Sequence, residues 1–96
     1  MQYIECTELR FTRHAVQQMF ARSISEQAVT SVVRSGEVIS AYPDDCPYPS
    51  YLLFCYIGSR PLHVVVALNA DDKTCIVVTA YEPSSGLWEP DFKTRM

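Results

Sequence analysis

Two histidines are the side chains of this sequence best suited to moving protons near neutral pH. His63 interrupts an apolar run, Leu62-His63-Val64-Val65-Val66, that predicts a buried strand. A buried imidazole needs hydrogen-bond partners, and the ordinary pKa of histidine suits acid–base catalysis. The alternative is a structural histidine near the start of the strand, whose ring is satisfied by neighbouring groups or by water.

His14 is the second candidate, in the first turn of a helix expected from Arg13 to about Arg22. The positive end of the helix dipole disfavours a protonated imidazole there. Together with Gln18 and Arg22, His14 forms a stripe at i, i+4 and i+8 on one side of the helix. Such a stripe can place a phosphate-binding arginine beside a proton-transfer group, or it can be a solvated face.

Arginines mark candidate anion sites, because the guanidinium fork matches the geometry of a phosphate group. Arg22 ends the first expected helix, and Arg60 lies in a turn three residues before His63. Chain geometry alone therefore keeps Arg60 near His63. The remaining arginines are weaker candidates: Arg10, Arg13, Arg34 and Arg95.

Tyr81 ends the last expected strand, and its position relative to His63 depends on the register of the hairpin around Asp71-Asp72. A two- or four-residue loop places His63 opposite Ala80 and sends Tyr81 to the other face. A three-residue loop reverses this, because a slip of one residue moves every side chain to the opposite face of the sheet. The sequence leaves both registers open.

The cysteines and acidic residues match no metal-binding pattern. The four cysteines have neither C-x-x-C nor zinc-site spacing: Cys6, Cys46, Cys55 and Cys75. Cys55 and Cys75 fall inside apolar runs, so we expect free, structural thiols. Asp44 and Asp45 stand in a proline-rich loop, where aspartates usually form turns. We therefore predict neither a metal nor another cofactor.

The elements that would position these residues are two helices followed by four strands. Thr12 and Ser25 are candidate N-caps, and Gly36 is placed to end the second helix. Residues at helical spacing predict an apolar face on each helix: Ala15, Val16, Met19 and Phe20, then Ala28, Val29, Val32 and Val33. A period of two then predicts strands over residues 37–42, 51–57, 62–69 and 74–82.

Other segments connect or flank these elements. Residues 1–11 are a lead-in with room for a short strand, and residues 43–49 are a rigid, exposed loop because three prolines remove backbone donors. In the tail over residues 84–96, Trp88 and Phe92 could pin the chain to the body. We therefore predict an α+β domain, with two N-terminal helices packed on a four-stranded, mainly antiparallel sheet.

Length and composition restrict the classes of function. The chain has 96 residues, which suits a single domain over residues 1–96. Its formal net charge of −3 argues against a large nucleic-acid footprint, because phosphate neutralisation drives such binding. No apolar run approaches the roughly 18 residues that span a bilayer, and the N-terminus lacks a signal-peptide core. We expect a cytoplasmic protein without a membrane partner.

Six short segments in order along residues 11–83 stand out together: Phe11–Ala15, Ala21–Ser25, Ser35–Ile39, Tyr42–Asp45 with Pro47–Pro49, Arg60–Val65 and Thr79–Pro83. Together they resemble a small bacterial family of domains of unknown function, whose members are often encoded beside a zinc-finger antitoxin-like protein. That family is similar in turn to the RelE/ParE-type toxins. The resemblance therefore implies a RelE-like fold of two helices and four strands.

The resemblance also implies a function, namely the toxin of a type II toxin–antitoxin pair, with an antitoxin as partner and mRNA or the ribosome as target. RelE-like toxins cleave mRNA without a metal by activating the ribose 2′-hydroxyl against the adjacent phosphate, which needs a base, an acid and positive charge. On this analogy the catalytic candidates are His63, His14 and Tyr81, and the phosphate contacts are Arg22 and Arg60.

Two readings of a different class remain beside the toxin. The first is a non-catalytic protein-binding module, in which the Tyr42–Asp45 loop and an exposed sheet edge make the contacts. The second is a small-molecule or metal site formed by His14, His63 and Tyr81. Convergence of the polar candidates in one cleft would favour catalysis, whereas their separation would favour the binding module.

Overall fold

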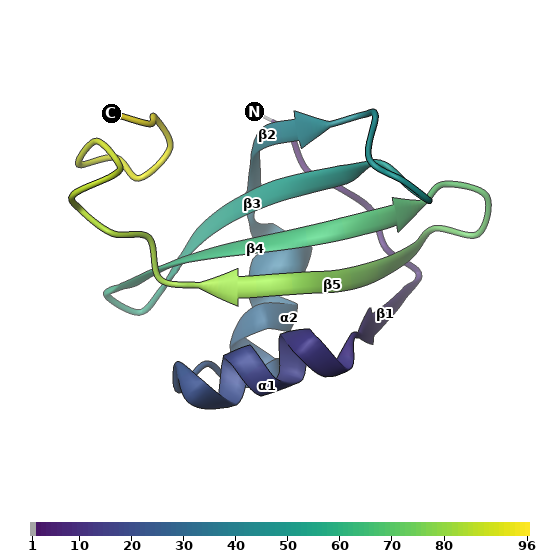
Figure 1. Cartoon of the computed structure of the whole chain (residues 1–96), viewed down its shortest axis with the longest axis horizontal. Helices are drawn as coiled ribbons and strands as arrows, with labels where there is room; N and C mark the ends of the chain where they lie inside the picture. Colours follow the sequence, from purple (N-terminus) through teal and green to yellow (C-terminus); the bar gives the residue numbers. More distant parts are fainter. Residues whose placement is uncertain (1) are drawn as a thin grey trace.

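The computed structural model describes residues 2–96 and has two helices on one side of a five-stranded sheet (Figure 1). The elements follow the order β1 (Glu8–Phe11), α1 (Arg13–Ala21), α2 (Glu26–Ser35), β2 (Glu37–Tyr42), β3 (Ser50–Ile57), β4 (Arg60–Asn69) and β5 (Thr74–Tyr81). The predicted α+β class and the order of the predicted elements are confirmed. None of the helices in residues 2–96 has the length and apolar content needed to cross a membrane.

The sheet contains one strand more than the four predicted. Its strand order is β1-β5-β4-β3-β2, and β1 pairs in parallel with β5 while the other neighbours are antiparallel. The extra strand comes from the lead-in over residues 1–11, of which Met1 lies outside the described residues. Because β1 is only four residues long, its period of two was too short to distinguish from a loop.

Both helices begin at the predicted N-caps. The Thr12 hydroxyl accepts a hydrogen bond from the Ala15 amide, and the Ser25 hydroxyl accepts one from the Ala28 amide, each at 3.0 Å. Gly36 ends α2, where a Cβ atom would lie 2.3 Å from the Val32 carbonyl oxygen. Glycine is therefore required for the close approach of α2 to the start of β2.

The apolar core lies between the helices and the sheet. It contains twelve buried residues: Ala15, Met19, Ile24, Val29, Val32, Val33, Leu53, Leu62, Val64, Val66, Val77 and Ala80. Helix α1 packs on β5, and α2 packs on β3 and β4. The predicted face of α1 is half wrong, because Ala15 and Met19 are buried while Val16 and Phe20 point into solvent. A short helix that rests on a single strand buries only a narrow stripe.

The expectation of four free thiols is wrong for one pair, because Cys6 and Cys75 form a disulfide. Their Cα atoms are 5.6 Å apart although 69 residues separate them along the chain. The parallel pairing of β1 with β5 brings them together, and sequence spacing alone could not reveal it. In the chain-entropy view, closing so long a loop stabilises the fold by roughly 4 kcal/mol. Cys46 and Cys55 are free.

Candidate functional site

A bulge in β5 settles the register between His63 and Tyr81. The β4–β5 loop has four residues, and Asn69 pairs with Thr74 across it. If the register set by the Asn69–Thr74 pair continued along both strands, His63 would lie opposite Ala80. The register shifts by one residue between Val65 and Val66, however, so His63 pairs with Tyr81 instead. The two side chains therefore share a face, which is the outcome that loop length alone argued against.

His63 points away from the helices and is fully buried under the C-terminal tail. Its Nε2 lies 2.7 Å from the Phe92 carbonyl oxygen, and its Nδ1 lies 3.3 Å from the Tyr81 hydroxyl oxygen. Because a carbonyl only accepts, Nε2 donates to Phe92 and Nδ1 accepts from Tyr81. The Trp88 ring packs edge-on against the imidazole at 4.6 Å between centroids. Both imidazole nitrogens are thus occupied by groups of the same chain.

The surroundings keep His63 and Tyr81 uncharged. Burial lowers the pKa of His63, and the hydrogen bond to the Phe92 carbonyl offsets this only in part. Burial also raises the pKa of Tyr81, as does the nearby Tyr42 phenol, while Arg95 and Arg22 act in the opposite direction. A neutral imidazole beside a neutral phenol can relay a proton, but here the second imidazole nitrogen faces a backbone carbonyl.

His14 and Arg22 belong to a separate polar network between α1 and β5. The Gln18 amide nitrogen lies 2.8 Å from His14 Nε2, and Gln18 Oε1 accepts from both Arg22 and the Thr79 hydroxyl. The Arg22 guanidinium also donates to the Ala80 carbonyl at 2.8 Å. The stripe predicted from helical spacing therefore exists, and it attaches α1 to the bulged part of β5.

Arg60 holds the turn between the helices. Its guanidinium donates to the Glu82 carboxylate at 2.8 Å, to the Ser23 carbonyl at 2.7 Å and to the Arg22 carbonyl at 2.8 Å. Ser23 has a left-handed backbone with φ of 56°, an uncommon conformation for serine. These donations satisfy carbonyls that the end of α1 leaves without helical partners. A phosphate bound by Arg60 would have to displace them.

The five candidate residues therefore form two groups along β5. His63 and Tyr81 pair beneath the tail, whereas His14, Arg22 and Arg60 lie on the side that carries α1. Within residues 2–96, no hydrogen bond joins one group to the other. Also within that range, no three His, Cys, Asp or Glu side chains gather closely enough to hold a metal ion.

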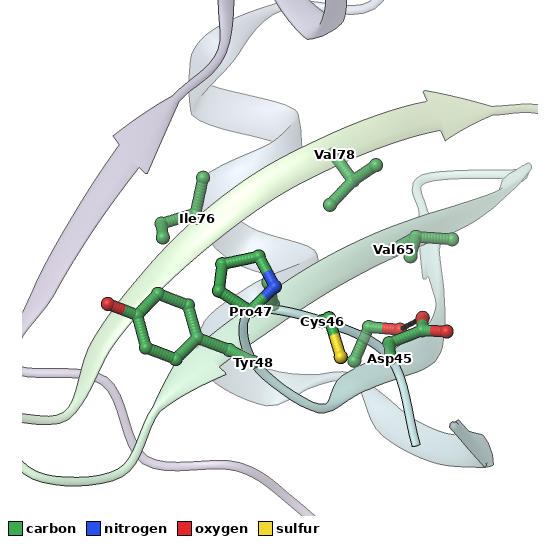
Figure 2. Close-up of a pocket in the computed structure, with 9 residues that line it drawn as sticks. Asp45, Cys46, Pro47, Tyr48, Val65, Ile76 and Val78 are labelled. Atoms are coloured by element: carbon green, nitrogen blue, oxygen red, sulfur yellow. Dashed lines mark hydrogen bonds between the residues drawn. The ribbon is translucent and has the colours of Figure 1, made fainter. Parts of the chain in front are cut away.

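An open groove with a volume of about 310 Å³, which was not predicted from the sequence, lies on the helix-free face of the sheet. We use the name open groove for the hollow lined by Asp45, Cys46, Pro47, Tyr48, Ser50, Val65, Ala67, Ile76 and Val78. Figure 2 shows Ile76 next to the Pro47 and Tyr48 rings and Val65 on the side of Asp45 and Cys46, with a helix behind the sheet. The floor is aliphatic, and the rim carries the Asp45 carboxylate.

The loop that forms the roof of the open groove is held in place by three contacts. The Ser50 hydroxyl donates to the Asp45 carboxylate, the Asn69 side chain donates to the Tyr48 hydroxyl at 3.3 Å, and the Leu68 amide donates to the Pro49 carbonyl at 2.9 Å. The groove is therefore already formed in the free protein. A signal for it was present in the sequence, because Val65 and Ala67 alternate with the core residues of β4 and so required cover on the other face.

Comparison with known proteins gives a family and no individual relative. A family model described as a domain of unknown function, DUF4258, matches residues 11–82. Neither the curated proteins nor the solved structures contain a match. The matched range covers the two helices and the strands from β2 to β5, and it omits the whole tail over residues 84–96, which covers His63. None of these comparisons shows a link to RelE/ParE-type toxins.

Proposed function

This chain belongs to the DUF4258 family, whose function is unknown, and from its own geometry we propose that it is a protein-binding module. The observation that carries the proposal is the open groove, a preformed apolar hollow. The candidate catalytic pair of His63 and Tyr81, by contrast, lies outside the groove and is already engaged within the chain. Exposed apolar surfaces that are rimmed by polar residues commonly mark sites of protein–protein interaction.

The chemistry of the open groove defines its occupant. The floor of Val65, Ala67, Ile76 and Val78 suits a branched apolar side chain. Asp45 stands at the rim and Asp44 beside it is exposed, so this side of the groove is negatively charged. We therefore expect a polypeptide segment that places a Leu, Ile or Met side chain next to a Lys or Arg. In the toxin–antitoxin interpretation, this segment would belong to the antitoxin.

A random-peptide display library selected on the immobilised full chain tests this proposal. The enriched peptides should share the apolar and basic pair, and they should bind Val78→Lys at least about tenfold more weakly than the wild type. Asp45→Asn should weaken them by a smaller factor and reduce the preference for the basic residue. Leu87→Lys is the matched control, because Leu87 is also an exposed apolar residue but lies outside the groove.

Two outcomes would overturn the binding proposal. One is a library that yields no enriched peptide on the folded chain. The other is a set of enriched peptides that bind Val78→Lys and Leu87→Lys as tightly as the wild type, which would place their site elsewhere on the surface.

A second candidate function is the metal-independent mRNA endoribonuclease that the toxin resemblance implies. The specific observation in its favour is the hydrogen bond between His63 and Tyr81, together with the influence of Arg22 and Arg95 on the Tyr81 phenol. Catalysis would require the tail to move, because the Phe92 carbonyl occupies the nitrogen of His63 that would face the RNA. In this reading the protein acts in the cytoplasm on mRNA at the ribosome.

Induced expression in a bacterial host separates the two candidates. A ribonuclease predicts growth arrest and new mRNA ends with the wild type, and neither effect with His63→Gln or Arg22→Gln at equal soluble expression. Normal growth with intact mRNA would reject the ribonuclease and leave the binding proposal standing.

A further inference from the structure

Helix α1 carries an apolar ridge that nothing in the described chain covers. Phe20 is 89% exposed and Val16 is 44% exposed, and the two lie one helical turn apart. Figure 1 shows α1 along the edge of the molecule, with the sheet on one side of it and no element on the other. Burial of an exposed phenylalanine side chain in an apolar environment is favourable, so this ridge is suited to association.

A hollow lies directly beside Phe20, where α1 ends and the turn to α2 begins. Its volume is about 520 Å³, and it is lined by Met19, Phe20, Ser23, Ile24 and Ser25. Met19 and Ile24 supply an apolar base, since both are nearly fully buried. A protruding ring and an apolar hollow are therefore neighbours on a single surface.

We propose that two copies of this chain pair through α1, with Phe20 of each copy seated in the hollow of the other. A two-fold axis beside Phe20 fills both hollows with one arrangement and closes the assembly at two copies. An unrelated partner would have to supply its own ring and its own hollow at the same spacing, whereas a second copy carries both.

Charge on either side of the ridge supports the same pairing. Arg13 stands exposed at the start of α1, and Glu26 stands exposed at the start of α2, beyond the hollow. Neither has an ion-pair partner within residues 2–96. An antiparallel arrangement of two α1 helices about the axis brings Arg13 of one copy toward Glu26 of the other. The ridge is thus flanked by opposite charges that a two-fold axis makes complementary.

The pairing is independent of the proposed binding function. The open groove lies on the helix-free face of the sheet, and the α1 ridge lies on the outer side of the helix layer. A dimer formed through α1 would therefore present two open grooves. Failure of one proposal leaves the other untouched.

Sedimentation equilibrium of the full chain, from micromolar to millimolar concentration, tests the dimer. All variants carry Cys46→Ser, so that the exposed thiol cannot cross-link two copies. The expected mass approaches twice the 10.9 kDa of one chain. Phe20→Ser should raise the dissociation constant at least roughly tenfold without loss of the circular dichroism signal, because Phe20 contributes little to the core. Val78→Ser is the control and should leave the dimer unchanged.

A charge exchange tests the geometry of the pair. Arg13→Glu should weaken the dimer by roughly threefold or more, and Arg13→Glu combined with Glu26→Arg should restore it. A wild-type chain that stays monomeric at millimolar concentration would overturn the proposal. So would a dimer that persists unchanged in Phe20→Ser, and a double exchange that gives no rescue would overturn the antiparallel arrangement.

Discussion

The two halves of the helix-free sheet face differ in what covers them. At one end, the tail over residues 84–96 covers His63, Tyr81 and Phe54 with Trp88 and Phe92. At the other end, the loop from Pro43 to Pro49 leaves the aliphatic floor of the open groove in contact with solvent. The same two strands, β4 and β5, run through both halves. Only the type of side chain changes along them.

The difference follows from the cost of burying polar atoms. A buried imidazole requires a donor and an acceptor in fixed positions. The two hydrogen bonds of His63 therefore stabilise a single conformation of the tail over the covered half. The aliphatic floor has no polar atom to satisfy and can be covered by different side chains at little cost. The covered half is therefore suited to stability, and the open half is suited to reversible binding.

Removal of the tail's main aromatic anchor should produce the largest effect. We expect Trp88→Ala to lower the free energy of unfolding by about 3–5 kcal/mol, because a nearly fully buried indole is lost. Val78→Ala, on the floor of the open groove, should cost less than about 1 kcal/mol. Urea unfolding followed by circular dichroism measures both. Equal losses for the two variants would show that the halves do not differ as described.

The His63 hydrogen bonds should account for the next largest effect. His63→Leu keeps the volume of the side chain but leaves the Phe92 carbonyl and the Tyr81 hydroxyl without their partner, which should cost about 1–3 kcal/mol. Tyr81→Phe removes one hydrogen bond only and should cost about 1 kcal/mol or less. If His63→Leu were as stable as the wild type, the polar bonds would not be what holds the tail.

Acid should weaken the covered half through His63. Burial holds the pKa of this imidazole below its ordinary value of 6.5, so below that pH the unfolded chain binds more protons than the folded chain. The contribution of His63 is therefore complete above about pH 6.5 and is lost as the pH falls toward the lowered folded value. Carboxylates that titrate in the same pH range contribute equally to the unfolding free energies of the wild type and His63→Leu. Their contribution therefore cancels in the difference between the two proteins. A difference between the two that does not change between pH 7 and pH 5 would contradict this account.

The sequence was sufficient for the helices, their caps and the strands that follow a regular pattern. Thr12, Ser25 and Gly36 act locally, and their neighbours in the chain determine what they do. The sequence was insufficient where a structural feature depends on contacts between segments that are distant in the chain. The disulfide between Cys6 and Cys75 depends on the parallel pairing of β1 with β5, and the exposure of Phe20 depends on which strand α1 rests upon.

The candidate site shows the same division between local and distant causes. The stripe of His14, Gln18 and Arg22 follows from helical spacing and is present. The pairing of His63 with Tyr81 depends on a bulge in β5. No residue of the β4–β5 turn indicates this bulge, so the sequence is compatible with both registers. The partner of His63 Nε2 is a backbone carbonyl in the tail, and every residue carries such a group, so composition contains no signal for it.

The smallest expected effect separates aromatic packing from charge in the attachment of the tail. Lys93 forms an ion pair with Glu37 at 3.0 Å, which joins the tail to β2. Because the Lys93 side chain is exposed to solvent, which screens the ion pair, Lys93→Ala should leave the urea unfolding midpoint nearly unchanged. Trp88 is the only tryptophan, so its fluorescence reports on the tail alone, and its emission maximum should stay unchanged. A red shift of the emission maximum in Lys93→Ala would mean that the ion pair keeps the tail on the sheet. The attachment of the tail would then depend on ionic strength rather than on the His63 and Trp88 contacts.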